Sequence, residues 1–400
     1  MKRFSALISA SLFASSLFAS ASAAPLQISF WHSMEGVKDL VAQFAREFNA
    51  SQSQYELSVT SVGNYREAPA KLQAAIKAAN PPTMFQAEFT YFSKLVGDGQ
   101  LVNLDKYEAA LPSSLTNDFY PAVWKAGEVG KVRYGLPWNV STPVLFYNAG
   151  VLRGAKVAPP KTWTELEATA DKLGNGRRPL LVIADAWTFE GLVASRGGTL
   201  VQSGKPNFAS PEAVAALDQL ARMVKGGSAQ FRTLDDAIGA AFDFTRGQNL
   251  MVVASVANWT DFQKLPFVEL GAAPFPCEKV CAVPLGGANI VLPKGSTSSE
   301  QAGALAFWKF LMEPARLAEW VKATAYVTPR RSVQPALAEY YAKNPYRKAA
   351  YSQLDDAFPR PSAPDYSVWQ KYLEDAIQKA TTGKLSAQAA LQEAQAKASQ

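Results

Sequence analysis

The sequence predicts an α/β fold, in which parallel strands alternate with helices, and three observations support it. Segments 26–30, 55–62 and 83–88 are typical of strands, and the segments between them are expected to be helices. Strand–helix–strand alternation produces parallel sheets with helices on their faces. A chain of 400 residues suits two large lobes or domains better than one. The composition, 48% hydrophobic and 18% charged, is ordinary for a soluble protein with a buried core.

The first 23 residues are typical of a secretory signal peptide. Two basic residues, Lys2 and Arg3, precede an apolar run and a stretch of small residues that fits cleavage after Ala23. No cysteine lies at this junction, so a lipid-anchored form is not expected. Later apolar runs are too short to span a bilayer. In a bacterium with two membranes, the mature protein is therefore expected in the periplasm.

The segment 30–36, Phe-Trp-His-Ser-Met-Glu-Gly, is expected to leave the carboxyl end of the first strand. Apolar residues between Val37 and Phe48 then recur at helical spacing. Open α/β sheets bind ligands at the carboxyl ends of their strands. This loop would offer one aromatic face and two hydrogen-bonding groups there. The alternative for Trp31 is an ordinary position in the core.

Two further residues are expected at the same edge of the sheet. The second strand ends in Gly-Asn-Tyr, which places Tyr65 just beyond it. A helix then runs to Asn80, where two prolines stop it. The third strand ends on Glu88. Because parallel strands share a carboxyl edge, Tyr65 and Glu88 are predicted to lie on one rim with the loop 30–36.

The rest of the chain contains one long extended segment and several helix starts. Residues 134–148 include two prolines and a β-rich run, and are expected to connect two lobes. Helices are expected to begin after Thr162 in a capping box, after Ser210, and at Ser298. Residues 250–255 are expected to form a buried strand, 271–276 and 286–292 to be extended, and the C-terminus to be helical.

The two cysteines, Cys277 and Cys281, are expected to form a local disulfide in an oxidising compartment. So short a loop gives about 2 kcal/mol in the chain-entropy model. The alternative, a zinc site, needs two more soft or imidazole ligands. The only histidine, His32, is far away in the sequence.

The sequence lacks the motifs of most enzyme classes. It has no nucleophile elbow, no zinc-protease motif, no dinucleotide fingerprint and no phosphate loop. The net charge of +6 is mild, and no basic block predicts nucleic-acid binding. A glycosidase needs only two carboxylates, for which Glu35 and Glu88 are candidates without support from spacing. A secreted α/β chain that lacks these motifs is expected to be a binding protein and not an enzyme. It is expected to hold no metal and no cofactor.

Five segments resemble the sn-glycerol-3-phosphate-binding proteins of ABC importers, within the class of extracellular solute-binding proteins for sugars. They are 30–36, 63–65, 141–148, 160–163 and 286–288. The resemblance implies the two-lobe periplasmic-binding-protein fold, each lobe a mostly parallel sheet flanked by helices, with the ligand in the inter-lobe cleft. It implies an N-terminal lobe of 24–138 plus about 285–325. The C-terminal lobe would be about 139–284 plus 326–400.

The resemblance also implies a set of ligand-binding residues: Tyr65, Glu88, Ser141, Ser255, Gly287 and Tyr326, with Trp187 as an aromatic wall. The arginine of the family pattern falls on Ser362, and Arg360 is the candidate replacement. Glu88 would accept hydrogen bonds from glycerol hydroxyls, so its loss should weaken binding with little change in folding. The alternative for Ser141 and Ser255 is that they bond local backbone groups.

The function implied by the resemblance is capture of a small ligand by hinged lobe closure. The ligand would be sn-glycerol-3-phosphate or a glycerophosphodiester, delivered by a monomeric protein to ABC permease subunits in the inner membrane. The alternative is an unphosphorylated sugar or oligosaccharide, favoured by the missing arginine. A secreted carboxylate-based glycosidase is the alternative from a different class.

Overall fold

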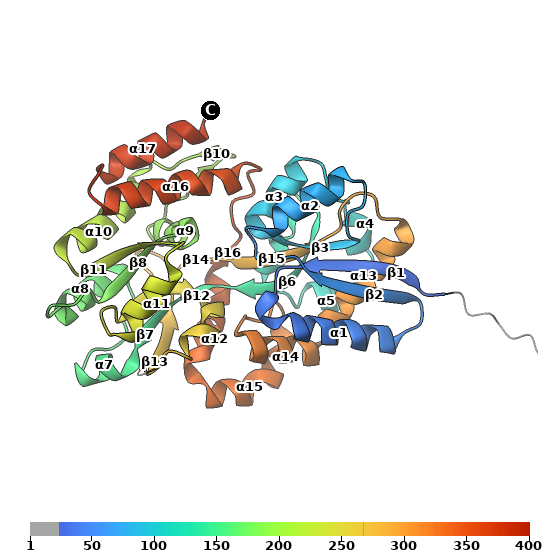
Figure 1. Ribbon diagram of the computed structural model, residues 1–400, viewed down its shortest axis with the longest axis horizontal. Coiled ribbons are helices and arrows are strands. Elements are labelled where there is room, and N and C mark those ends of the chain that lie inside the picture. The colour runs from blue at the N-terminus through green and yellow to red at the C-terminus, as the bar shows by residue number, and fades with distance from the viewer. Residues whose placement is uncertain (1–23, 267) are drawn as a thin grey trace, which may run out of the picture.

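The computed structural model describes residues 24–266 and 268–400 as two α/β lobes, each built on a five-stranded sheet (Figure 1). The expected signal peptide, residues 1–23, lies outside the described residues. In the described part of the chain, no helix combines the length and apolarity needed to cross a membrane.

The first sheet has the strand order β2-β1-β3-β15-β6. Its strands are β1 (Leu26–His32), β2 (Tyr55–Ser61), β3 (Met84–Glu88), β6 (Gly135–Ser141) and β15 (Gly286–Val291). The accompanying helices are α1 (Lys38–Ser51), α2 (Ala68–Lys77), α3 (Phe89–Gly97), α13 (Ser298–Leu311) and α14 (Pro314–Thr324). The three strands predicted at the start of the chain are confirmed. However, β1 continues to His32, so Trp31 and His32 lie in the strand and not in the following loop.

The second sheet has the order β11-β8-β12-β7-β13. Its strands are β7 (Pro143–Asn148), β8 (Leu180–Ala184), β11 (Ala229–Thr233), β12 (Met251–Ser255) and β13 (Leu270–Pro274). The helices of this half are α7 (Ala149–Gly154), α8 (Trp163–Leu173), α9 (Ala186–Ser195), α10 (Pro211–Gly226), α11 (Ala237–Thr245), α12 (Trp259–Phe262), α16 (Tyr366–Thr381) and α17 (Ala387–Ala398).

The predicted fold class is confirmed, but both sheets are mixed. In the first sheet β1 is parallel to β2 and β3, whereas β15 is antiparallel to β3 and β6. In the second, β8 is parallel to β11 and β12, whereas β7 is antiparallel to β12 and β13. The antiparallel pairs involve strands next to the crossings between the lobes. The lobe boundaries expected from the sequence stay a prediction.

The chain crosses between the sheets at Thr142. This residue separates β6, in the first sheet, from β7, in the second, and is fully buried. Gln353 donates from Nε2 to Thr142 Oγ1 over 2.8 Å and to Pro143 O over 2.7 Å. The prediction that 134–148 connects the lobes is therefore confirmed. A second crossing joins β14 (Val283–Pro284), which pairs with β16 (Ala357–Phe358), to β15.

The smaller elements complete the chain. They are α4 (Asp105–Glu108), α5 (Ser113–Thr116), α6 (Pro121–Lys125), α15 (Gln334–Lys343), the hairpins β4 (Glu128–Val129)–β5 (Val132–Arg133) and β9 (Val201–Gln202)–β10 (Lys205–Pro206), and the 3-10 helices η1 (Glu35–Val37), η2 (Val256–Asn258), η3 (Arg331–Val333), η4 (Pro345–Lys348) and η5 (Tyr351–Asp356). The predicted starts of α8, α10 and α13 are confirmed by side-chain caps from Thr162, Ser210 and Thr297.

The core is continuous through the crossing. One apolar cluster extends from Phe30 and Trp138 in the first sheet to Val144 and Phe146 of β7. Another lies between the second sheet and helices α8, α9, α10 and α16. The strand ends of both sheets therefore rest on a closely packed apolar frame.

Cys277 and Cys281 form a disulfide, as predicted. Cys277 N donates to Lys161 O over 2.9 Å, and Cys277 O accepts from Trp163 N over 3.0 Å. The closed loop also contacts the end of α9, where Ser195 O accepts from two of its backbone N–H groups. The disulfide loop therefore connects the start of α8 with the end of α9.

Candidate functional site

The carboxyl ends of β1, β2 and β3 share one edge of the first sheet, which faces the second lobe (Figure 1). Tyr65 follows β2, and Glu88 is the last residue of β3. Trp31 is partly buried and packs against an apolar cluster that includes Val62 and Leu72. Much of the Trp31 ring therefore packs in the core, as the alternative interpretation predicts. Tyr65 and Glu88, in contrast, lie at the rim as predicted.

Tyr65 belongs to a buried hydrogen-bond network that the sequence did not reveal. Its hydroxyl accepts from Asn139 Nδ2 over 2.8 Å and from Gln86 Nε2 over 3.2 Å. Gln86 Nε2 also donates to Asn139 Oδ1 over 2.8 Å, and Gln86 Oε1 accepts from Ser33 N over 2.6 Å. Gln86 and Asn139 are at most 1% exposed. The network thus fixes the position of the Tyr65 phenol relative to β3 and β6.

Tyr326 lies beside this network. Its ring packs on Trp320, with 6.0 Å between the ring centroids. Burial raises the pKa of Tyr326, although hydrogen bonds with Asn139 and Tyr65 oppose the shift. Burial likewise raises the pKa of Tyr65 well above its ordinary value. Both phenols are therefore uncharged at neutral pH and act as neutral hydrogen-bonding groups.

Glu88 caps the N-terminus of α3. Its Oε2 accepts from Thr90 N over 2.9 Å, from Thr90 Oγ1 over 2.6 Å and from Tyr91 N over 3.3 Å. Its Oε1 lies 3.6 Å from Arg360 Nη1, and the side chain is 21% exposed. One carboxylate oxygen of Glu88 is thus used within the protein, and the other faces Arg360.

Arg360 is bound by a second carboxylate, that of Glu190 on α9. Its Nε and Nη2 donate to Glu190 Oε2 and Oε1, each over 2.7 Å, and Nη2 also donates to Gln370 Oε1 over 2.7 Å. Gln370 Nε2 donates to Thr90 Oγ1 over 3.0 Å. Arg360 therefore lies in a cluster that joins α9 and α16 to the start of α3. Sequence reasoning missed Glu190, a carboxylate inside an apolar helix segment.

Ser141 and Trp187 meet at the second crossing. The indole Nε1 of Trp187 donates to Leu285 O over 3.1 Å. A Cβ on Gly286 would lie 2.6 Å from both Ser141 Oγ and the Trp187 ring, so these groups surround a glycine backbone. At Gly287, φ is +114°, and a Cβ would lie 2.0 Å from Asn139 O. Glycine is therefore needed at position 287.

The remaining predicted serine has a local partner. Ser255 Oγ accepts from Ala257 N over 3.2 Å and so caps η2, as the backbone-bonding alternative predicts. Asp185 caps α9 in the same way, accepting from Trp187 N over 3.2 Å and from Thr188 N over 3.1 Å. Glu374 on α16 bonds the Ala186 backbone, and burial raises its pKa to about 7, with Asp185 adding to the shift.

These contacts determine what the site can bind. Phosphate is usually held by helix N-termini and by arginine. Here the N–H groups at the start of α3 and α9 bond Glu88, Asp185 and Glu374, and Arg360 bonds Glu190. Within residues 24–266 and 268–400, the predicted site residues therefore contribute two phenols, two hydroxyls, an indole and one carboxylate, together with one cation that is already paired.

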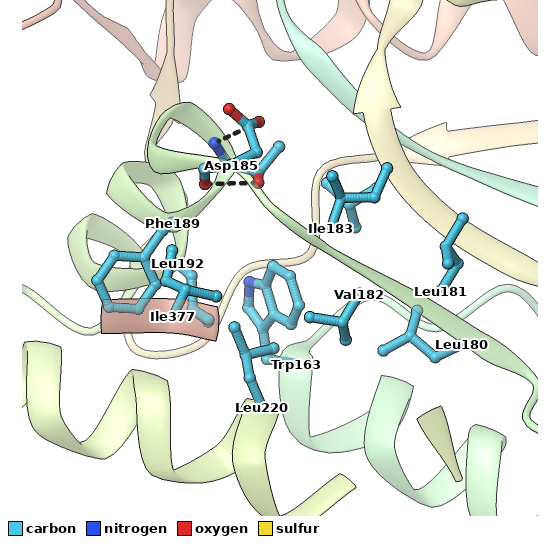
Figure 2. A pocket seen from close by; sticks show the side chains of 12 residues that line it. Trp163, Leu180, Leu181, Val182, Ile183, Asp185, Phe189, Leu192, Leu220 and Ile377 are labelled. Atoms are coloured by element: carbon cyan, nitrogen blue, oxygen red, sulfur yellow. Dashed lines mark hydrogen bonds between the residues drawn. The ribbon is translucent and has the colours of Figure 1, made fainter. Parts of the chain in front are cut away.

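Two hollows are found in this part of the molecule, and of the predicted site residues Arg360 lines one of them. A cavity of about 30 Å³ lies inside the second lobe, where Figure 2 shows Trp163, Phe189 and Ile377 among its apolar lining and Asp185 at its edge. It has room for only one or two water molecules. A groove of about 610 Å³ lies between the lobes, bordered by α3, the β4–β5 hairpin, α9, the β9–β10 hairpin and residues 358–363. Arg360 and Glu190 both line this groove.

Comparisons with known proteins all match this chain to bacterial solute-binding proteins. The family model "Bacterial extracellular solute-binding protein" matches residues 43–349. The sn-glycerol-3-phosphate-binding periplasmic protein UgpB of Escherichia coli strain K12 is 27% identical over 360 residues, covering 84% of this chain and 82% of that protein. The protein of the same name from Shigella flexneri serotype 5b is 26% identical over 360 residues, which again cover 84% of this chain and 82% of that protein.

Two solved structures illustrate the similarity of fold. The cyclic α-maltosyl-1,6-maltose binding protein from Arthrobacter globiformis matches with a TM-score of 0.82 and 22% identity, over 93% of this chain and 97% of that chain. UgpB from Mycobacterium tuberculosis, in complex with glycerophosphocholine, matches with a TM-score of 0.80 and 22% identity, over 94% and 98%. At such identities the likeness shows the two-lobe fold alone.

Proposed function

This chain belongs to the family of bacterial extracellular solute-binding proteins, and from that premise we propose that it is the substrate-binding protein of an ABC importer. It captures a polyhydroxylated solute between its lobes in the periplasm. As a monomer, it then delivers the solute to permease subunits in the inner membrane. The chain acts by binding and release and is not an enzyme.

The observation that supports this proposal is the convergence of hydrogen-bonding and aromatic groups between the two sheets. The ligand-binding residues that we propose are Tyr65, Glu88, Ser141, Trp187, Ser255, Gly287 and Tyr326. Hydroxyl groups suit the Glu88 carboxylate as acceptor and the two phenols as neutral partners. The carbon skeleton of a polyol can pack on the Trp187 ring. Closure about the crossing strands removes water from these contacts.

The charges around this site bear on the ligand class. Because the N–H groups at the start of α3 and α9 and the Arg360 guanidinium already bond carboxylates, a dianionic phosphate would enter beside negative charges, next to a cation that is already paired. A glycerophosphodiester carries only one negative charge on its phosphate. Relatives named for sn-glycerol-3-phosphate binding are 27% identical to this chain, which supports a ligand that contains glycerophosphate. We therefore favour a glycerophosphodiester over sn-glycerol-3-phosphate itself.

An unphosphorylated sugar or oligosaccharide is the second candidate. It is favoured by the Arg360–Glu190 pair, since a neutral ligand needs no free cation. The arginine expected to replace the family residue has a partner inside the protein, so a direct role for Arg360 in phosphate binding depends on release of that pair.

Calorimetry with glycerophosphocholine, sn-glycerol-3-phosphate and maltose tests the proposal. We expect glycerophosphocholine to bind at least tenfold more tightly than sn-glycerol-3-phosphate, equivalent to about 1.4 kcal/mol. Tight binding of maltose alone would favour the second candidate. Binding of none of the three would overturn the ligand class. Hydrolysis of labelled oligosaccharides by the purified protein would overturn the proposal that it is not an enzyme.

A further inference from the structure

The side chain of Arg360 is 5% exposed and that of Glu190 is 3% exposed, so this ion pair is almost completely shielded from water. A buried guanidinium requires a nearby negative charge, because an unpaired buried charge is strongly destabilising. Glu190 supplies it through two parallel hydrogen bonds, the geometry in which arginine binds carboxylates and phosphates most strongly. Glu190 therefore occupies the face of Arg360 that a phosphate would use.

The remaining surroundings reinforce this arrangement. The Tyr366 hydroxyl donates to Glu190 Oε1, and Arg360 Nη1 faces Glu88 Oε1 at 3.6 Å. Although burial, the largest effect, acts to lower the pKa of Arg360, the carboxylates of Glu190 and Glu88 raise it overall. The guanidinium thus stays charged, and two carboxylates compensate it.

An anion has room to approach this pair. Arg360 and Glu190 both line the groove of about 610 Å³ between the lobes, and Lys125 and Lys131 line the same groove. Both lysines are exposed. The groove therefore contains two exposed lysines and the Glu128 carboxylate, together with a guanidinium whose Nε and Nη2 are bonded by Glu190, with Gln370 also accepting from Nη2.

We propose that Glu190 is a specificity-determining residue that masks Arg360 and so excludes phosphate monoesters and inorganic phosphate from the site between the lobes. The inference rests on the proposed function, because it concerns which solutes that site accepts. Replacement of the Glu190 charge leaves Arg360 buried without its main counterion. A phosphate entering from the groove then supplies the missing negative charge.

The test is the variant Glu190→Gln, which keeps the side-chain volume and removes the charge. Calorimetry with inorganic phosphate and with sn-glycerol-3-phosphate should show about a tenfold or larger gain in affinity over the wild type. The double variant Glu190→Gln/Arg360→Met should lose this gain. Asp218→Asn, which removes an exposed charge on α10 of the same lobe, is the matched control and should gain nothing. A folded Glu190→Gln protein without any gain overturns the proposal.

A crystal structure of the wild type soaked in sn-glycerol-3-phosphate keeps the proposal testable if Glu190→Gln does not fold. We expect Arg360 to remain on Glu190 with no phosphate oxygen within hydrogen-bonding distance, and a direct Arg360–phosphate contact would overturn the proposal. Binding of glycerophosphocholine and maltose to the same samples reports separately on the proposed function. Phosphate gain without polyol binding would refute the function alone, and polyol binding without phosphate gain would refute the role of Glu190 alone.

Discussion

Replacing Glu88 by alanine removes two separable contributions. The carboxylate caps α3 through Thr90 and Tyr91, and it is the acceptor that we propose for a ligand hydroxyl. The sequence suggested that folding would be little changed, because a rim residue has few core contacts. The structure revises that expectation, since the cap is a structural role. We therefore expect Glu88→Ala to lower both stability and affinity.

The size of each effect follows from its contacts. Loss of an N-terminal cap costs about 1 kcal/mol. Arg360 keeps both hydrogen bonds to Glu190, so its 3.6 Å contact with Glu88 adds little. A ligand hydroxyl left without its buried acceptor costs about 1–3 kcal/mol, which corresponds to a roughly 5- to 150-fold loss of affinity.

Urea denaturation followed by circular dichroism measures the first effect, and calorimetry with the tightest of the three test ligands measures the second. Thr297→Ala is the matched control, because Thr297 caps α13 in the same lobe by accepting from Glu300 N over 3.3 Å. It should lose about 1 kcal/mol of stability and keep its affinity. Unchanged stability of Glu88→Ala would refute the capping argument, and affinity within twofold of wild type would refute the ligand-acceptor assignment.

Three further predictions concern the frame of the site. Burial lowers the pKa of His32 to about 4, so the stability present above pH 6.5 should fall by up to about 3 kcal/mol as the pH drops through 4. NMR titration of this single histidine reads the midpoint directly, and a value near 6.5 contradicts the argument. Thiol labelling of the unfolded, unreduced protein should modify neither Cys277 nor Cys281, and two labelled thiols would disprove the disulfide. Gly287→Ala should lose about 2 kcal/mol or more in thermal unfolding, because its Cβ would strike Asn139 O; Gly36→Ala, with nothing within 4 Å of its Cβ, should unfold like the wild type.

Local patterns in the sequence predicted the elements that depend on near neighbours. Alternation and turn residues identified β1, β2 and β3, capping residues identified the starts of α8 and α10, and the Ser-Ser-Glu segment identified the start of α13. The rim positions of Tyr65 and Glu88 follow from these elements, because the ends of parallel strands must meet. The disulfide was also local, since the spacing of its two cysteines restricts them to one loop.

The contacts that distinguish this site join residues far apart in the chain. Gln86 and Asn139 are 53 residues apart, and Arg360 and Glu190 are 170 residues apart. No periodicity connects such pairs. The available signal was a polar residue within an apolar run, as with Gln86 in β3 and Glu190 in α9. That signal indicates a buried partner but does not say which residue it is.

The position of β15 in the first sheet has a consequence for biogenesis. This strand lies between β3 and β6, yet residues 286–291 are synthesised after every strand of the second sheet. Until they emerge, β3 lacks a neighbour on one side, β6 lacks its only neighbour in the sheet, and the proposed ligand rim has no complete sheet beneath it. Pairing across such long stretches of chain makes folding slow. The first sheet, and with it the rim at its strand ends, is therefore completed only after most of the chain has been made.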